Sequence, residues 1–349
     1  MSEPIAQELA GIATAVHGLI QASGYWQEVA PEHLSGACLS YLGRGGKCLR
    51  SGLLVWASRL CGGRDEQAYR AAAAVEVFHT WTLVHDDIID RDERRRGGPT
   101  VHAQAAAAAR RAGASEPEAA HYGTTVGILA GDLQHGWAVE LLSGLPAESA
   151  WPELLGRLEG QTLRRVIGGE MLDVDLARRA LEEVTERDLL QVIAWKTAEL
   201  FAYCGWAGAR LGQGSPADCG RLERFGRELG MAFQLRDDVL GLVGDSGAMG
   251  KPVGSDLREG KRTLPLLAAW AQAGAQEREI ITRALQPKGT AAERAEAIRV
   301  VVARGGVAAA QARAEQHLGL ARAELEPLPA TPPRARLGEL ARMLVERDR

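Results

Sequence analysis

Three aspartates stand close together after an apolar run in the first third of the chain. Asp86 and Asp90 are four residues apart, so in a helix they share one face, whereas Asp87 points about 100° to one side. Mg²⁺ prefers hard oxygen ligands and completes its coordination shell with water and substrate phosphates. The spacing therefore indicates a metal site that also takes a diphosphate. A solvated acidic helix end, balanced by the arginines after it, is the alternative.

Cationic and imidazole groups are placed where they would serve such a site. Lys47 and Arg50 come after a Gly-Gly pair, and on a helix that begins there they would point at one anion together with free backbone N–H groups. His79 lies seven residues before Asp86, two helical turns away on nearly the same face. A solvated basic helix start and a buried core histidine are the alternatives.

These groups belong to an ordered series of motifs that resembles the trans-isoprenyl diphosphate synthases, or polyprenyl synthases. The series covers roughly residues 40 to 270, and chance does not produce it. In order, it comprises GGKxxR at Gly45–Arg50, HTxxLxHDDxxD at His79–Asp90, RRGxPT at Arg95–Thr100, GD at Gly131–Asp132, KT at Lys196–Thr197, FQxxDD at Phe233–Asp238 and GKxxGxDLxxGKxTLP at Gly250–Pro265.

The resemblance implies a Mg²⁺-dependent head-to-tail condensation of isopentenyl diphosphate with an allylic diphosphate. The expected products are diphosphate and a short all-trans prenyl diphosphate of C15 to C20, farnesyl or geranylgeranyl diphosphate. The resemblance also implies three Mg²⁺ ions per active site, with Mn²⁺ as a substitute, and a homodimer. Mg²⁺ would neutralise the departing diphosphate, and the double bond of isopentenyl diphosphate would attack the resulting allylic cation.

Site residues are implied by the matched motif positions. The implied metal ligands are Asp86, Asp87, Asp90, Asp237 and Asp238. The implied catalytic residues are Asp86, Asp87, Asp90, Lys196, Asp237 and Lys251. Isopentenyl diphosphate would be held by Gly46, Lys47, Arg50, His79 and Arg96. The allylic diphosphate would be held by Arg95, Lys196, Lys251 and Lys261, with Thr197 and Gln234 as polar lining.

Three positions depart from the family pattern. Gly241 stands where the second acidic motif often has a third aspartate, which puts the metal affinity of that motif in doubt. Cys48 stands where a basic residue is common, so one cation of the usual set is missing. Glu170 replaces the glutamine of a GQxxD motif and adds a negative charge near the expected cation.

Two other function classes remain open. A class I terpene cyclase uses similar acidic motifs, but it need not bind isopentenyl diphosphate, and here Lys47, Arg50, His79 and Arg96 are all present. A non-catalytic subunit of a heteromeric synthase should lack the metal carboxylates that this chain keeps. A nucleotide-phosphate enzyme is poorly supported, since neither GxxxxGK[ST] nor a strand-linked GxGxxG occurs.

Composition describes an ordinary globular protein. The 349 residues are 46% hydrophobic with a net charge of −4, which gives no reason to expect nucleic acid as a partner. No apolar run reaches the roughly 18 residues of a membrane span. The five cysteines are widely spaced and form no CxxC pair, which is typical of a reducing compartment. We expect a cytoplasmic protein without a membrane span.

The periodicity of the chain predicts helix almost everywhere and no strand. With the resemblance, we expect an all-α fold in which residues 1–349 form one polyprenyl synthase domain, a helical bundle around a deep central cavity. Helices are predicted near residues 4–22, 30–42, 47–61, 65–89, 119–143, 150–175, 186–212, 216–241, 263–273, 276–285, 290–303, 306–324 and 334–347, with a partly helical segment at 103–120.

Product length should depend on bulky side chains below the metal site. Trp81 lies five residues before Asp86, where a large aromatic residue accompanies short products in the family. We predict that Trp81 is the main floor of the cavity and Phe78 the next barrier, with Thr82 also pointing down the cavity. The alternative is that the indole of Trp81 packs in the core.

Overall fold

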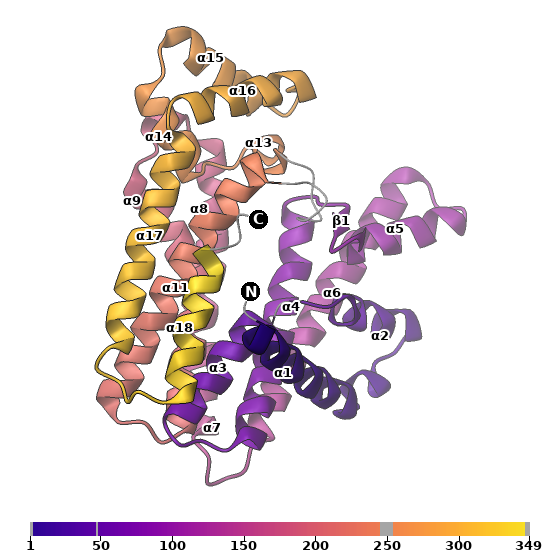
Figure 1. The fold of residues 1–349 in the computed structure, drawn as a ribbon. Helices are drawn as coiled ribbons and strands as arrows, with labels where there is room; N and C mark the ends of the chain where they lie inside the picture. Colours follow the sequence, from indigo (N-terminus) through magenta and orange to yellow (C-terminus); the bar gives the residue numbers. More distant parts are fainter. Residues whose placement is uncertain (1–2, 47, 245–253, 346–349) are drawn as a thin grey trace. The chain divides into compact units, whose positions relative to one another are not determined.

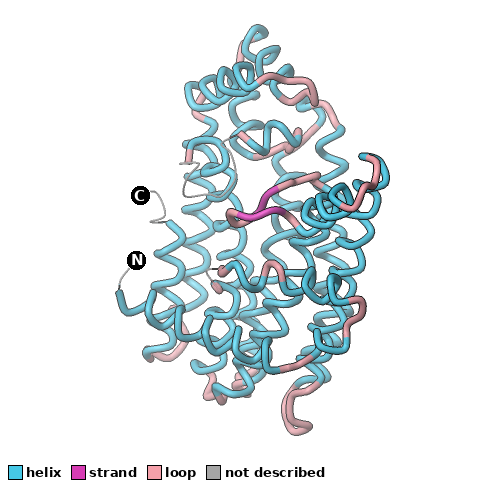
Figure 2. Tube along the Cα trace, turned by 90° about the vertical axis from the view of Figure 1, so that its right-hand side faces the viewer, coloured by secondary structure: helices cyan, strands magenta, loops and turns pink. Residues whose placement is uncertain are grey.

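The computed structural model describes residues 3–46, 48–244 and 254–345. Nearly all elements are helices (Figure 2), so the predicted all-α class is confirmed. The chain divides into two compact units, Met1–Gly156 with Ala207–Gly214, and Arg157–Trp206 with Ser215–Arg349. We call these unit 1 and unit 2. The expectation of one domain around a central cavity stays a prediction.

Unit 1 is built on two long helices that lie side by side (Figure 1). Helix α4 is rich in alanine, which has a high helix propensity, and it carries two acidic residues in its first turn. Their negative charges interact favourably with the positive end of the helix dipole. Helix α6 begins with a capping box of Ser115 and Glu118. The elements are α1 (Glu3–Ala22), η1 (Tyr25–Glu28), α2 (Glu32–Leu39), η2 (Leu42–Arg44), α3 (Leu49–Leu60), α4 (Asp65–Ile89), α5 (Val101–Arg111), α6 (Glu116–Ser143) and most of α7 (Trp151–Arg157).

The end of α4 packs directly on the backbone of α6. A Cβ atom at Gly131 would lie 2.1 Å from Nε2 of His85, and one at Gly127 would lie 2.6 Å from Cδ1 of Ile88. Neither space admits a side chain, so glycine is required at both positions for the two helices to approach this closely. This contact fixes the last turn of α4, which carries the first acidic motif.

A short hairpin comes after α4, and the prediction that the chain has no strand is wrong here. Strand β1 (Arg94–Arg95) pairs antiparallel with β2 (Gly98–Pro99). The turn between them has positive φ at both central residues, 49° at Arg96 and 74° at Gly97, as two-residue hairpin turns of type I′ require. Strands of two residues are too short to show an alternating pattern, which is why periodicity missed them.

Unit 2 is organised around helix α11, which packs along α17 and against the segment η5. Its core includes Leu189, Leu235 and Ala314 from these or neighbouring elements. Helices α15 and α16 pack on each other next to α14 (Figure 1). The elements are η3 (Leu158–Thr162), α8 (Leu163–Arg178), η4 (Leu181–Glu183), α9 (Glu186–Val192), η5 (Ile193–Ala198), α10 (Glu199–Leu211, whose last turn counts with unit 1), α11 (Pro216–Val243), α13 (Ser255–Glu259), α14 (Leu264–Gln272), α15 (Ala275–Ala284), α16 (Ala291–Ala303), α17 (Gly306–Leu325) and α18 (Pro332–Val345).

Two predicted continuous helices are interrupted by π-helical segments. The helix predicted at 150–175 is α7, the π segment η3 and α8, and the helix predicted at 186–212 is α9, the π segment η5 and α10. The long helices are otherwise close to expectation, and α4 has the predicted bounds. Among the described residues, no helix combines the length and apolar character needed to cross a membrane.

Candidate active site

The first acidic motif ends helix α4. One carboxylate oxygen of Asp86 and one of Asp90 lie within 4.8 Å of each other, and Asp90 is the C-cap residue, whose N–H donates to the Asp86 carbonyl. Two hard oxygen donors at this spacing fit one Mg²⁺ ion that keeps water or phosphate in its other positions. The predicted sharing of one helix face by Asp86 and Asp90 therefore holds.

Asp87 has a different environment from its two neighbours. Its side chain is buried; the hydroxyl of Tyr41 donates to Oδ2, and Nε of Arg95 donates to Oδ1 at 2.6 Å. Burial raises the pKa of Asp87 to about 6, although Arg95 and Tyr41 oppose the rise. Tyr41 also accepts a hydrogen bond from the Val101 backbone at 3.2 Å. Both oxygens of Asp87 are thus engaged by protein groups, and its role as a metal ligand stays a prediction.

Arg50 and His79 lie together, as predicted for a shared anion site. A guanidinium nitrogen of Arg50 is 3.2 Å from Nε2 of His79. Burial, with the positive charges of Arg50, Arg96 and Arg95, lowers the pKa of His79 well below its usual value. Since the guanidinium can only donate, we assign Nε2 as the acceptor and the proton of the neutral ring to Nδ1, 3.4 Å from the hydroxyl of Thr82.

Arg96 holds the loop that precedes α3. Its guanidinium donates to the carbonyl oxygens of Gly45 at 2.6 Å and Tyr41 at 3.4 Å, and a Cβ atom at Gly46 would lie 3.3 Å from it. Lys47 lies outside the described residues. Cys48, at the usual position of a cation, is buried, and burial raises its pKa to about 12. This cysteine therefore offers no charge to a diphosphate.

In unit 2, Lys196 joins two carboxylates of α8. Its Nζ atom lies 2.8 Å from Oε2 of Glu170 and 2.8 Å from Oδ2 of Asp173. The glutamate that replaces the family glutamine is thus an ion-pair partner of the lysine that the resemblance assigns to the allylic diphosphate. A second predicted cation, Lys261, lies 3.0 Å from Glu259. Lys251 lies outside the described residues.

A chain of polar contacts leads to the second acidic motif. The hydroxyl of Thr197 donates to Oε1 of Gln234 at 2.9 Å, and Nε2 of Gln234 donates to Oδ1 of Asp238 at 2.8 Å. Burial and then the nearby charge of Asp256 raise the pKa of Asp238 well above its usual value. Asp237 is exposed. Thr197 and Gln234 therefore orient Asp238, which extends their predicted role as lining.

The residues predicted to set product length pack against α6. The rings of Phe78 and Trp81 lie 5.0 Å apart, and the ring of Trp81 lies 5.1 Å from His135 of α6. Phe78 is fully buried, and Trp81 is 8% exposed. This packing favours the alternative in which the indole is a core group. Thr82 lies instead on the side of His79, where its hydroxyl donates to the His79 carbonyl.

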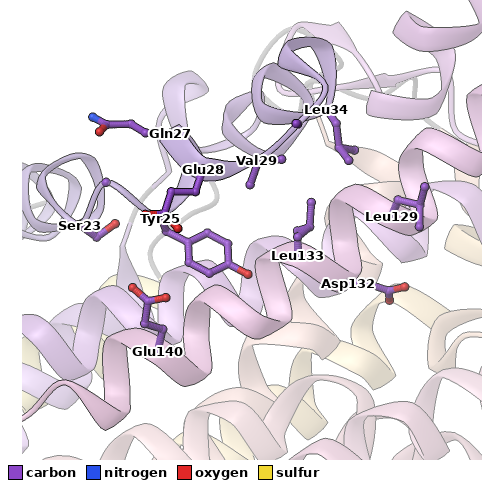
Figure 3. Close-up of a pocket in the computed structure, with 12 residues that line it drawn as sticks. Ser23, Tyr25, Gln27, Glu28, Val29, Leu34, Leu129, Asp132, Leu133 and Glu140 are labelled. Carbon is purple, nitrogen blue, oxygen red and sulfur yellow. The ribbon is translucent and has the colours of Figure 1, made fainter.

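Two described pockets of unit 1 have no lysine or arginine in their lining. The one in Figure 3, of about 850 Å³, lies between the segment Ser23–Leu34 and α6, and carries Glu28, Asp132 and Glu140. The other, of about 900 Å³, is mostly apolar, and its lining includes Ala105, Ala108 and Ala109 of α5. Neither suits a diphosphate, because an anion needs positive charge or N–H donors. Arg50, His79, Arg95 and Arg96 remain the predicted anion-binding groups among the described residues of this unit.

Two residues of this site carry no signal in the sequence motifs. Tyr41 lies in a buried cluster with Val84 and Val101 and bonds Asp87. Arg44 donates to the Pro99 carbonyl at 2.5 Å and thereby holds the hairpin that carries Arg95. Tyr41 and Arg44 both precede the first motif in the sequence. Their roles follow only from the fold, which brings the segment after α2 next to the hairpin.

Comparisons with known proteins show the family of this chain. The family model for polyprenyl synthetase matches residues 31–302. A short chain isoprenyl diphosphate synthase from Methanothermobacter thermautotrophicus is 35% identical over 323 residues, which is 92% of each chain. A geranylgeranyl diphosphate synthase from Sulfolobus acidocaldarius is 39% identical over 253 residues, 71% of this chain and 70% of that protein.

A solved structure gives the same result. Geranylgeranyl pyrophosphate synthase from Corynebacterium glutamicum, complexed with isoprenyl diphosphate and magnesium, is similar with a TM-score of 0.85 and 31% identity, covering 98% of this chain and 99% of that one. The chain therefore belongs to the polyprenyl synthetase family. It is an enzyme, a prenyltransferase of the trans-isoprenyl diphosphate synthase type.

Proposed function

We propose that this protein condenses isopentenyl diphosphate with an allylic diphosphate, head to tail, to give farnesyl or geranylgeranyl diphosphate. The observation that carries the proposal is the position of Asp86 and Asp90 on one face at the end of α4, with oxygens within 4.8 Å. The neighbouring pair of Arg50 and His79 is what a second, isopentenyl diphosphate substrate would need.

Each group has a defined part in this reaction. When bound, Mg²⁺ neutralises the diphosphate of the allylic substrate and so promotes its departure. Asp86 and Asp90 would hold the metal, and Arg50 with neutral His79 would hold isopentenyl diphosphate. The allylic C–O bond breaks, and the diphosphate leaves with the electron pair. The isopentenyl double bond then forms the new C–C bond, and the proton lost passes to the departed diphosphate.

The residues of unit 2 would serve the allylic diphosphate. We propose that Lys196, with Lys251 and Lys261, stabilises negative charge on the leaving group, while Asp237 and Asp238 supply further metal ligands. The pairing of Lys196 with Glu170 and Asp173 supports a role for Glu170 in positioning this lysine. Three Mg²⁺ ions per active site, and replacement by Mn²⁺, belong to the same proposal.

We also propose a cytoplasmic homodimer. Unit 1 exposes large apolar side chains on α4 and α6, which supports an interface near the first motif. Their exposed fractions are 46% for Ile89, 40% for Tyr122, 45% for Ile128 and 47% for Leu129. Sedimentation at micromolar concentration should give twice the chain mass; a fully active monomer would contradict the proposal. Cell fractionation tests the location.

One assay tests the reaction. The protein is incubated with isopentenyl diphosphate, Mg²⁺ and dimethylallyl, geranyl or farnesyl diphosphate, and the products are separated by chain length. We expect C15 to C20 prenyl diphosphates that disappear when EDTA is added. Cyclic hydrocarbons formed without isopentenyl diphosphate would identify a terpene cyclase, and the absence of any product would identify a non-catalytic subunit.

A further inference from the structure

The second acidic motif has a gap where its third side chain would stand. Gly241 lies four residues after Asp237 on α11, so the two share a helix face. In the first motif, the residue at the equivalent spacing is Asp90, one of the proposed metal ligands. Gly241 is buried and has no side chain that could provide a ligand atom.

The carboxylate of Asp256 fills this gap. A Cβ atom at Gly241 would lie 2.8 Å from Oδ2 and 3.5 Å from Cγ of Asp256. An aspartate at this position would carry its own oxygens about 2.4 Å from its Cβ, by ordinary C–C and C–O bond lengths. The Asp256 oxygen therefore lies at nearly the distance from α11 at which an aspartate on α11 would have placed one.

Backbone hydrogen bonds hold Asp256 in this position. The N–H of Gly254, next to α13, donates to the carbonyl of Gly241 at 2.9 Å, which ties the start of α13 to the last turn of α11. The N–H of Lys261 donates to the Asp256 carbonyl at 2.9 Å. The place of Asp256 beside the acidic pair is thus set by the fold around α13.

We infer that Asp256 supplies the third carboxylate of the second acidic motif, in place of the side chain that Gly241 lacks. Asp256 would bind the same divalent cation that Asp237 and Asp238 would bind together with a diphosphate. This inference deepens the proposed function and rests on it. It also explains how the second acidic motif could still bind a cation although Gly241 provides no carboxylate.

The test exchanges the carboxylate between the two positions. Mn²⁺ binding is measured by electron paramagnetic resonance in the presence of inorganic diphosphate, so no isoprenoid turnover is needed. The variants are Asp256→Asn, Gly241→Asp and the double variant Gly241→Asp with Asp256→Ala. Glu279→Gln, an exposed carboxylate of α15, is the control. Circular dichroism shows whether each variant keeps its helical content.

We expect Asp256→Asn to weaken Mn²⁺ binding by about 10- to 100-fold, the usual effect of losing an oriented group at a metal site. Gly241→Asp alone should bind no better than the wild type, because its side chain meets the Asp256 carboxylate. The double variant should recover most of the lost affinity. Wild-type affinity in Asp256→Asn, or a folded double variant as weak as Asp256→Asn, would overturn the inference. Mn²⁺ binding that shows the expected pattern in a protein that makes no prenyl product would instead refute the proposed function.

Discussion

Arg95 holds Asp87 and Asp86 at the same time. Its Nε atom donates to Oδ1 of Asp87 at 2.6 Å, and a terminal guanidinium nitrogen donates to Oδ2 of Asp86 at 3.2 Å. Burial acts against the charge of this arginine, but the two carboxylates outweigh it and raise the pKa of Arg95. The cation assigned to the allylic diphosphate thus also compensates the charge of the acidic motif.

Arg95→Lys should separate these two tasks. A lysine presents one compact charge and cannot reproduce two fixed N–H directions. We expect the KM for geranyl diphosphate to rise about tenfold, equivalent to roughly 1.4 kcal/mol, with a smaller change for isopentenyl diphosphate. Steady-state kinetics with each substrate varied in turn measures this. Arg94→Lys, on the exposed side of the hairpin, is the control, and equal effects of the two variants would count against the assignment.

Asp86→Asn and Asp90→Asn should nearly abolish turnover. Each substitution keeps the shape of the side chain and removes a charged metal ligand. A loss of about a thousandfold in kcat corresponds to roughly 4 kcal/mol of lost transition-state stabilisation. Glu148→Gln, an exposed carboxylate of the same unit, should keep full activity. Near-normal turnover of either aspartate variant at saturating Mg²⁺ would remove these residues from the metal site.

Arg50→Ala and His79→Ala should raise the KM for isopentenyl diphosphate more than that for the allylic substrate. His79→Gln should be milder, because its amide oxygen can still accept from Arg50. The pKa of His79 lies well below its usual value, so its ring stays neutral and the KM should show no histidine step between about pH 6 and pH 8. A defect confined to the allylic substrate would reverse the pocket assignment.

Product length tests the role of the aromatic pair. Trp81→Ala should lengthen the products if the indole forms the cavity floor, and Phe78→Ala added to it should lengthen them further. Both side chains pack on α6, so each change should also cost about 3–5 kcal/mol of stability, and the assay is best done at low temperature. Leu320→Ala, an exposed apolar residue of α17, is the control. An unchanged distribution in active variants would place the floor elsewhere.

Glu199 should make stability depend on pH in a defined direction. It is 1% exposed and accepts from Arg165, Arg227 and Gln161. Burial alone would raise its pKa, but these partners outweigh it and lower the pKa below 4.5. The folded state therefore binds the proton of the Glu199 carboxyl more weakly than the unfolded state does. The stabilisation from Glu199 is fully present above pH 4.5 and is lost as the pH falls through the lower pKa of the folded state.

Glu199→Gln should accordingly reduce the free energy of unfolding at pH 7 by about 3 kcal/mol, as for a broken buried ion pair. The difference from the wild type should shrink as the pH falls from the usual pKa of glutamate, 4.5, toward the lower pKa of the folded state. Urea titration at several pH values measures it. Glu324→Gln breaks a more exposed pair with Arg224 and should cost under about 1 kcal/mol. A constant difference across pH would contradict the assignment.

The sequence was sufficient to predict the long helices and the pairs of residues that lie close together within a single helix. Asp86 with Asp90, and the bounds of α4, can be predicted from local spacing alone. Sequence spacing did not predict the contacts that depend on chain segments meeting in space. Tyr41 reaches Asp87 from the segment after α2, Asp256 reaches Gly241 from another helix, and Trp81 faces α6 because of packing. Short strands and π turns escaped prediction because they leave no period to detect.

The π segment η5 contains both Lys196 and Thr197. A π turn holds one residue more than an α turn, so it is an insertion that a helix has absorbed without breaking. Deleting one residue from η5 would let α9 and α10 run on as a single regular helix with nearly the same faces, because six residues in a π turn rotate the chain about as far as five residues in an α-helix. The change would fall on side chains inside the segment, and we expect it to turn Lys196 away from Glu170 and Asp173. The π segment therefore sets the directions of the side chains within it without changing the course of the helices on either side.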